Sequence, residues 1–199
     1  MAKLILLNKP FRVMCQFSDS ENRKTLADYV KTPKVYPAGR LDYDSEGLVV
    51  LTDDGQLQHQ ISDPRHKLRK CYWVQLEGQI TEQELKRLAN GIELKDGLTK
   101  PAQVKTIEPP TQLWPRVPAI RQRKDQPTSW IELAISEGKN RQIRRMTAAV
   151  GYPTLRLIRH SIGNWSLGDL QPGQYSQDIV HTMQGDEKNR KTFKLTKTK

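Results

Sequence analysis

The chain has 199 residues, of which 36% are hydrophobic and 28% charged, and its formal net charge is +11. This balance predicts a folded domain that buries roughly 70% of its unfolded surface, and it excludes a chain disordered throughout. Two distant cysteines, Cys15 and Cys71, indicate neither a disulfide framework nor a zinc site, and the apolar N-terminal run is too short for a signal peptide or a membrane span. The excess of basic residues favours a polyanionic partner, nucleic acid first, and we expect a cytoplasmic monomer.

Short apolar runs predict strands in the first half of the chain, at residues 3–9, 48–52 and 70–78. Pro10 ends the first of them. Residues 24–30 and 56–61 predict short helices, and residues 81–91 predict a longer one. Thr81 and Glu84 fit a capping box at the start of that helix, and Gly91 fits its end.

The second half begins with residues 108–128, which are rich in proline and arginine and predict a long ordered loop. A strand over 129–138, a helix that Gly151 and Pro153 terminate, and a strand over 153–160 follow. We therefore expect an α+β fold with a catalytic domain over residues 1–182. Residues 183–199 are basic and predict a disordered tail.

The helix in this half concentrates positive charge. Between Lys139 and His160 there are six lysines and arginines and no acid. On a helical wheel Arg141, Arg144 and Arg145 share one side, and apolar residues occupy the other. Three arginines within about one turn repel one another, so we expect an anion there, either phosphates or a buried carboxylate.

Residues 37–55 are the acidic exception in this basic chain, with five acids against one arginine. The spacing from Asp42 to Asp53 superficially fits a calcium loop, but the flanking helix and the final glutamate are missing. The four histidines show no ligand spacing, so we expect no metal. Turn chemistry and a solvated surface explain most of the acids. Asp42 differs because it follows Arg40 and precedes a buried strand, so its carboxylate is expected to face a cleft and to need an arginine partner.

Three spaced motifs carry a resemblance to a known family: GRLDYDSEGLVVLTDDG, then KCYWVQLEG, then EGKNRQIRRMTAAVGYPTLRLIR. Together they resemble the RsuA-type family of ribosomal RNA pseudouridine synthases, from LLNKPF to about residue 180. The resemblance implies the pseudouridine synthase fold, a mixed and mainly antiparallel sheet flanked by helices around a central catalytic cleft. It also implies that Asp42 is catalytic, that Tyr72 stacks on the target base and that Arg144 pairs with Asp42.

The segment LWPRVPAIRQRKDQPTSW is similar to an insertion in family members that act on the large ribosomal subunit. Many members begin with a small S4 RNA-binding domain, whereas this chain starts at the first catalytic-domain strand. The family pattern is loose at Tyr43, Asp44 and Cys71, so no role is assigned to them.

The expected function is isomerisation of a specific uridine to pseudouridine in 23S, large-subunit ribosomal RNA, without cofactor, metal or nucleotide. The carboxylate could attack C1′, attack C6 or abstract a sugar proton, and the sequence leaves these alternatives open. The alternative function is a non-catalytic RNA-binding factor in ribosome assembly. A basic groove for phosphates is expected from Arg40, Lys70, Lys139, Arg141 and Arg159, with Arg116, Arg121 and Arg123 as outer contacts.

Overall fold

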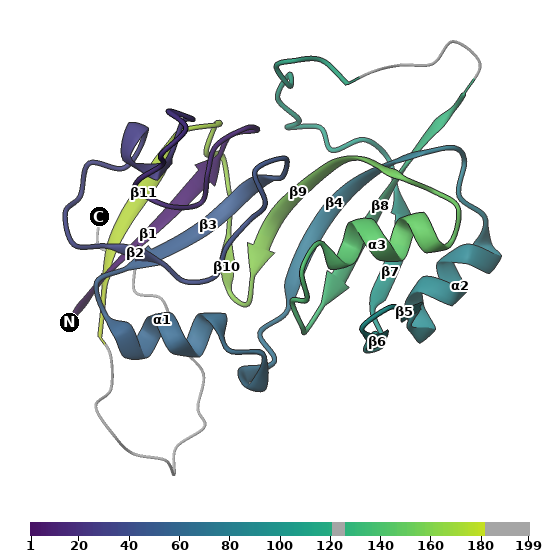
Figure 1. The fold of residues 1–199 in the computed structure, drawn as a ribbon, viewed down its shortest axis with the longest axis horizontal. Helices are drawn as coiled ribbons and strands as arrows, with labels where there is room; N and C mark the ends of the chain where they lie inside the picture. Colours follow the sequence, from purple (N-terminus) through teal and green to yellow (C-terminus); the bar gives the residue numbers. More distant parts are fainter. Residues whose placement is uncertain (121–125, 182–199) are drawn as a thin grey trace.

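A computed structural model describes residues 1–120 and 126–181, and its main feature is a nine-stranded sheet (Figure 1). Seven strands follow one another across it in the order β11 (Tyr175–Val180), β1 (Ala2–Lys9), β3 (Glu46–Thr52), β9 (Thr154–Ile162), β4 (Lys70–Glu77), β8 (Thr128–Ile135) and β7 (Gln103–Ile107). Two short strands complete it, β10 (Trp165–Ser166) beside β9 and β2 (Tyr36–Pro37) beside β3. A separate hairpin joins β5 (Glu93–Leu94) to β6 (Gly97–Leu98).

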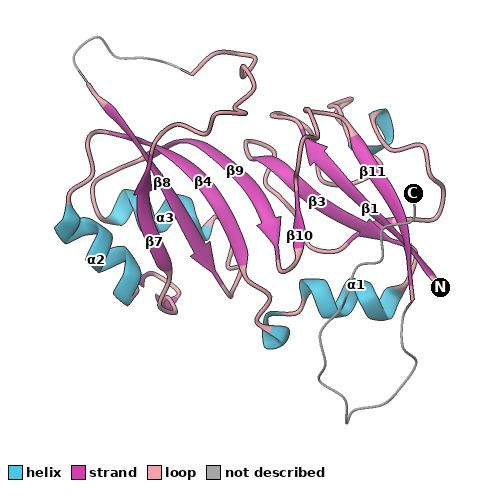
Figure 2. Cartoon of the chain, turned by 180° about the vertical axis from the view of Figure 1, so that it is seen from behind, coloured by secondary structure: helices cyan, strands magenta, loops and turns pink. Residues whose placement is uncertain are grey.

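The pairing is mainly antiparallel, which confirms the expected sheet. Among the described strands, β3 and β9 are the pair that runs parallel, with Gly47 opposite Arg159. This pair joins the half of the sheet that contains β1, β3 and β11 to the half that contains β4, β8 and β7 (Figure 2).

The helices are α1 (Gly55–Ser62), α2 (Glu82–Asn90) and α3 (Gln142–Ala149). Thr81 accepts a hydrogen bond from the Glu84 N–H at the start of α2, which is one half of the predicted capping box, and the Glu84 carboxylate pairs with Arg87 instead of completing it. Gly91 follows the last residue of α2, as predicted. Figure 1 shows α3 in front of the strands of its half, and Figure 2 shows it behind them, so α3 covers one face of the sheet.

Two apolar clusters cover the two faces of the sheet. The front cluster contains Ile143 and Met146 of α3 together with Tyr72 and Val74 of β4. The back cluster lies on the opposite face. Along β3 its apolar residues alternate with those of the front cluster. Its members include Leu48, Val50, Trp114, Trp130 and Ile158. The strand predicted at 48–52 is therefore buried on both faces.

Several elements differ from the prediction, and the short strands β5, β6 and β10 are among those that were not predicted. The segment predicted as a helix over 24–30 forms only a 3-10 turn, η1 (Leu26–Asp28), because the Asp28 carboxylate bonds back to the Thr25 N–H and closes a capping box over one turn. The edge strands β7 and β11 were not predicted, since their residues are mostly exposed and form no apolar run. Residues 121–125 of the proline-rich loop and 183–199 of the predicted tail lie outside the described residues.

Within residues 1–120 and 126–181, no helix combines the length and apolar character that a membrane span requires.

Candidate active site

The acidic motif forms a tight turn immediately before β3. The Ser45 N–H donates to the Asp42 carbonyl at 3.1 Å, which closes the turn over Asp42–Ser45. Two further groups hold it from outside: the Arg12 N–H donates to the Tyr43 carbonyl at 2.9 Å, and Arg144 Nη2 donates to the Asp44 carbonyl at 2.7 Å. We call these four residues, Asp42–Ser45, the candidate catalytic turn.

Gly47 brings this turn close to the neighbouring strand. Its φ is +103°, and a Cβ atom added there would lie 2.3 Å from the Arg159 carbonyl oxygen. The guanidinium of Arg159 then reaches across β3, where Nε donates to the Leu48 carbonyl at 2.8 Å. Glycine at this position therefore permits the parallel contact that places the candidate catalytic turn over the centre of the sheet.

Tyr72 lies in the same row of the sheet. Arg159 is paired with Gly47 on one side and with Tyr72 on the other, next to a bulge between Cys71 and Tyr72. Two strand spacings separate Gly47 from Tyr72, which is about 10 Å. The structure thus brings the motif of Asp42 and the strand of Tyr72 together although they are thirty residues apart. Tyr72 is 7% exposed and belongs to the front cluster.

The charge balance of the turn is set by Asp44. Arg141 donates two hydrogen bonds of 2.9 Å to the two carboxylate oxygens of Asp44, and its Nη1 lies 3.6 Å from Asp42 Oδ2. Burial raises the pKa of Asp44, but the hydrogen bond from Arg141 and the charges of Arg144 and Arg141 outweigh it, so the pKa is lowered. The Asp42 side chain is 34% exposed. It lies near the positive charge of Arg141 but accepts no short hydrogen bond from it.

The predicted pair of Arg144 with Asp42 is not the one that forms. The Arg144 guanidinium lies against Asp44 instead, with Nε 3.5 Å from Oδ2 and Nη2 bonded to the Asp44 carbonyl. The reason is the backbone of Arg141, which precedes α3 in the left-handed region at φ 46° and directs its side chain, rather than that of Arg144, past Asp44 toward Asp42. The anion expected beside the basic helix is thus a partly buried carboxylate.

Several of the cations predicted to contact phosphates are buried or are hydrogen-bonded to backbone carbonyls. Arg159 is 2% exposed and bonds to backbone carbonyls, and Lys70 is also buried, where desolvation lowers the pKa of its ammonium group. Lys139 donates to three carbonyls between residues 96 and 98. Arg40 and Arg141 are the two exposed members of the set: Arg40 is hydrogen-bonded to Gln16, and the Arg141 side chain is 46% exposed.

The predicted outer contacts are also revised. Arg116 donates to the carbonyls of Pro118, Ala119 and Leu155 and packs its guanidinium 4.4 Å from the centre of the Phe11 ring. Its donors therefore serve the fold of the long loop. Arg121 and Arg123 fall among the residues outside the description.

Sequence reasoning missed Asp44 and misjudged Glu46. Glu46 was expected in a turn or on a solvated surface, but it is buried in β3 and accepts two hydrogen bonds of 2.8 Å from Arg156 and one of 2.7 Å from Trp114 Nε1. The available signal was its position at the start of an apolar strand, because a carboxylate there must be paired.

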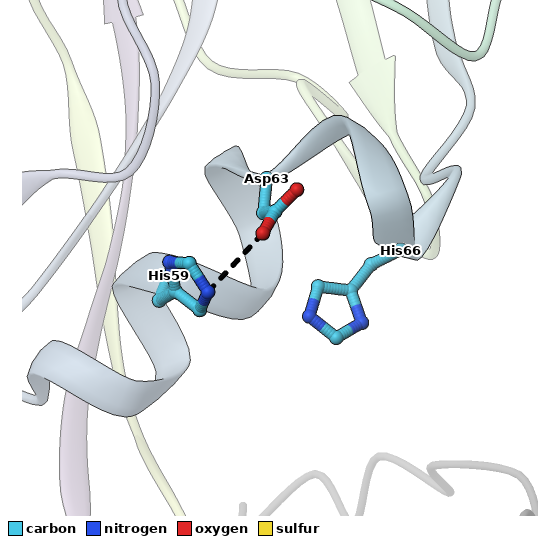
Figure 3. Close-up of side chains that lie close together, drawn as sticks. All are labelled: His59, Asp63 and His66. Carbon is cyan, nitrogen blue, oxygen red and sulfur yellow. Dashed lines mark ion pairs between the residues drawn. The ribbon is translucent and has the colours of Figure 1, made fainter.

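The expectation about histidines also needs correction. His59 and Asp63 have the i,i+4 spacing of a helix end, and His66 follows on the next turn, η2 (Pro64–His66). Figure 3 shows both imidazole rings beside the Asp63 carboxylate, and the candidate ligand atoms all lie within 4.8 Å of one another. We call His59, Asp63 and His66 the histidine cluster. Arg65 bonds to Asp63 Oδ2 at 2.8 Å through Nε, and this guanidinium competes with any cation for the carboxylate.

Comparison with known proteins decides the family. The model of a family described as RNA pseudouridylate synthase matches residues 3–149. The chain belongs to this family. Ribosomal large subunit pseudouridine synthase E of Xanthomonas campestris pv. campestris is 55% identical over 177 residues, which cover 88% of this chain and 95% of that protein. The protein of the same name from Vibrio parahaemolyticus is 54% identical over 175 residues, covering 88% of this chain and 73% of that protein.

Two solved structures share the fold described above. A crystal structure of pseudouridylate synthase has a TM-score of 0.75 and 32% identity, covering 90% of this chain and 71% of that one. An H/ACA ribonucleoprotein bound to a substrate RNA containing 2′-deoxyuridine has a TM-score of 0.55 at 15% identity, over 82% of this chain and 48% of that one, which shows a shared fold. As a member of the RNA pseudouridylate synthase family, the chain is an isomerase that converts uridine to pseudouridine in RNA.

Proposed function

We propose that the protein converts a specific uridine of large-subunit ribosomal RNA to pseudouridine and that Asp42 is its catalytic carboxylate. The substrate class is supported by the names of relatives that are 54–58% identical over most of this chain. The role of Asp42 is supported by one observation: its carboxylate is partly exposed beside Arg141, while the remaining acids of the motif are bonded to arginines, to a helix N-terminus or to the Lys3 backbone N–H.

The reaction breaks the bond between N1 of uracil and C1′ of the ribose, turns the base and joins C5 to C1′. Nothing is oxidised or reduced, and the proton released from C5 is balanced by the one gained at N1. An ionised Asp42 could act on C1′, on C6 or on a sugar proton, and each role needs an anion with free lone pairs. Arg141 at 3.6 Å supports the charge without occupying those lone pairs, because its short hydrogen bonds go to Asp44.

Tyr72 is proposed to stack on the flipped uracil from the front face of the sheet. Removing a base from its stack costs a few kcal/mol, and aromatic contact offsets part of it. Arg40 belongs to the first of the three motifs and Arg141 to the third, and both are exposed beside the turn. We propose that these two cations bind the phosphates that flank the target uridine. Because the proposed residues all come from one chain, we further propose a monomer with one catalytic domain over residues 1–182. Because relatives are named for the large ribosomal subunit, we propose that it acts in the cytoplasm.

The test is release of tritium from ribosomal RNA labelled at C5 of uracil. The wild-type protein should release label, and Asp42→Asn should release none while binding the same RNA with unchanged affinity. Asp178→Asn, an exposed change on the edge strand β11, is the matched control and should be fully active. Equal release by Asp42→Asn and wild type would refute the role of Asp42, and binding without release by the wild type would favour an assembly factor. Sequencing pseudouridines in both ribosomal subunits, with and without the gene, identifies the target.

A further inference from the structure

A buried polar network lies behind the candidate catalytic turn, on the face of the sheet opposite Tyr72. Glu46, the residue that follows Ser45, is 1% exposed and has three hydrogen bonds. Oε1 accepts from Trp114 Nε1 at 2.7 Å and from Arg156 Nη2 at 2.8 Å, and Oε2 accepts from Arg156 Nε at 2.8 Å. Both carboxylate oxygens are therefore satisfied by groups from distant parts of the chain.

The three residues come from segments that the sequence separates widely. Glu46 begins β3, Arg156 lies on β9, and Trp114 belongs to the proline-rich loop between β7 and β8. The Arg156 guanidinium also lies 5.6 Å from the centre of the Trp114 ring. The loop is thus tied to the strand that carries the candidate catalytic turn by a charged hydrogen bond in a dry environment, where such bonds are strongest.

The same loop is held by further contacts around Trp114. Arg116 Nη1 donates to the Leu155 carbonyl at 3.2 Å, one residue before Arg156. Gln112 Nε2 donates to Asp169 Oδ1 at 3.2 Å. These contacts fix the loop on both sides of Trp114. The indole N–H is therefore held toward Glu46 by the fold of the loop as well as by its own hydrogen bond.

We propose that Trp114, Glu46 and Arg156 form a positioning network that fixes the C-terminal end of the candidate catalytic turn from the back of the sheet. Trp114 belongs to the back cluster, whereas Tyr72 belongs to the front cluster, and Glu46 and Arg156 both contact Trp114, so the network acts through the turn and not on the substrate. This inference rests on the proposed function of Asp42. The proline-rich loop then contributes to the reaction by holding the carboxylate in its reacting geometry, where small displacements lower the rate.

The decisive variant is Trp114→Phe, which keeps an aromatic ring and removes the N–H donor. Arg156 still pairs with Glu46, so the variant is expected to fold. Turnover should fall about tenfold with KM within about twofold of wild type, the rate equivalent of about 1.4 kcal/mol. Trp130→Phe, a change at another buried tryptophan of the back cluster, is the matched control and should leave turnover unchanged.

A second measurement follows the turn without any activity assay. The Ser45 N–H, bonded to the Asp42 carbonyl, should exchange with solvent about tenfold faster in Trp114→Phe, as measured by NMR. The Ala102 N–H, bonded to the Ala89 carbonyl beside the distant edge strand β7, should keep its rate. Unchanged Ser45 exchange, or an equal loss of turnover in Trp130→Phe, would overturn the network. An inactive wild-type protein with faster Ser45 exchange in the variant would instead refute the proposed function alone.

Discussion

Asp44 determines how the positive charge of Arg141 is shared with Asp42, and Asp44→Asn tests this directly. The aspartate accepts two hydrogen bonds of 2.9 Å from Arg141. Asparagine has the same size but only one acceptor and no charge, so it releases part of the guanidinium. Arg141 Nη1 already lies 3.6 Å from Asp42 Oδ2 and needs to move about 0.8 Å to form a short charged hydrogen bond.

The expected loss of turnover follows from the strength of the hydrogen bond that Arg141 would form with Asp42. A hydrogen bond to a charged group contributes about 1.5–3 kcal/mol. It stabilises Asp42 as an anion, and it weakens when the carboxylate shares its electrons in the transition state. Turnover by Asp44→Asn should therefore fall about 10- to 150-fold. RNA affinity should be equal or higher, because the protein loses a negative charge.

The assay is tritium release under single-turnover conditions, with RNA binding measured separately by filter retention. Because Arg141 is also a proposed phosphate contact, the double variant Asp44→Asn/Arg141→Gln is measured at saturating RNA. It removes the guanidinium that would move and should recover part of the lost rate. The reasoning is refuted if Asp44→Asn keeps its rate within twofold of wild type, or if the double variant is slower than Asp44→Asn alone.

Three further predictions concern stability and metal binding. Gly47→Ala should lower the free energy of unfolding by more than about 4 kcal/mol in urea titrations, because the added Cβ would collide with the Arg159 carbonyl. The control Gly39→Ala, where φ is +85° and the added Cβ has open space, should lower the free energy of unfolding by only about 1–2 kcal/mol. Burial lowers the pKa of Lys9 to about 8, below its unfolded value of 10.5, so the unfolded chain binds more protons between these values. Wild-type stability should then rise by about 2 kcal/mol from pH 8 to 10 relative to Lys9→Met, and parallel curves would contradict this. Arg65→Gln frees the carboxylate of the histidine cluster and should tighten Zn²⁺ binding at least tenfold by calorimetry, and equal affinities would show that Arg65 does not compete.

The elements that the sequence predicts well are those with a buried pattern. The strands β1, β3, β4, β8 and β9 contain apolar runs, and α2 has its caps at Thr81 and Gly91. The strands β7 and β11 differ because they lie at the edges of the sheet, where pairing on one side depends on backbone groups and leaves most side chains in water. Such strands are determined by their neighbours more than by their own residues.

The site shows the same division. The chain order of the motifs is sufficient to propose Asp42 and Tyr72, but the helical wheel counts Arg141 as part of the helix, whereas α3 begins at Gln142. Which arginine meets Asp42 depends on the backbone of Arg141, whose φ of 46° is uncommon for a residue other than glycine. The resemblance selects Arg144 by its place in the sequence motif, and neither that motif nor helical periodicity represents the backbone turn that brings Arg141 closer.

Net charge is a poor guide to the RNA-binding surface of this protein, because many of its cations bind its own carbonyl groups. Lys9, Lys139 and Arg159 all donate to backbone oxygens, as do Arg116 and Arg144. The candidate catalytic turn and the proline-rich loop have no regular ladder, so their carbonyls need donors from elsewhere. Long basic side chains can supply those donors across a strand. The basic residues thus have two roles, binding RNA phosphates and donating hydrogen bonds to the protein's own carbonyl groups. The second role allows a short turn to hold Asp42 in a fixed place.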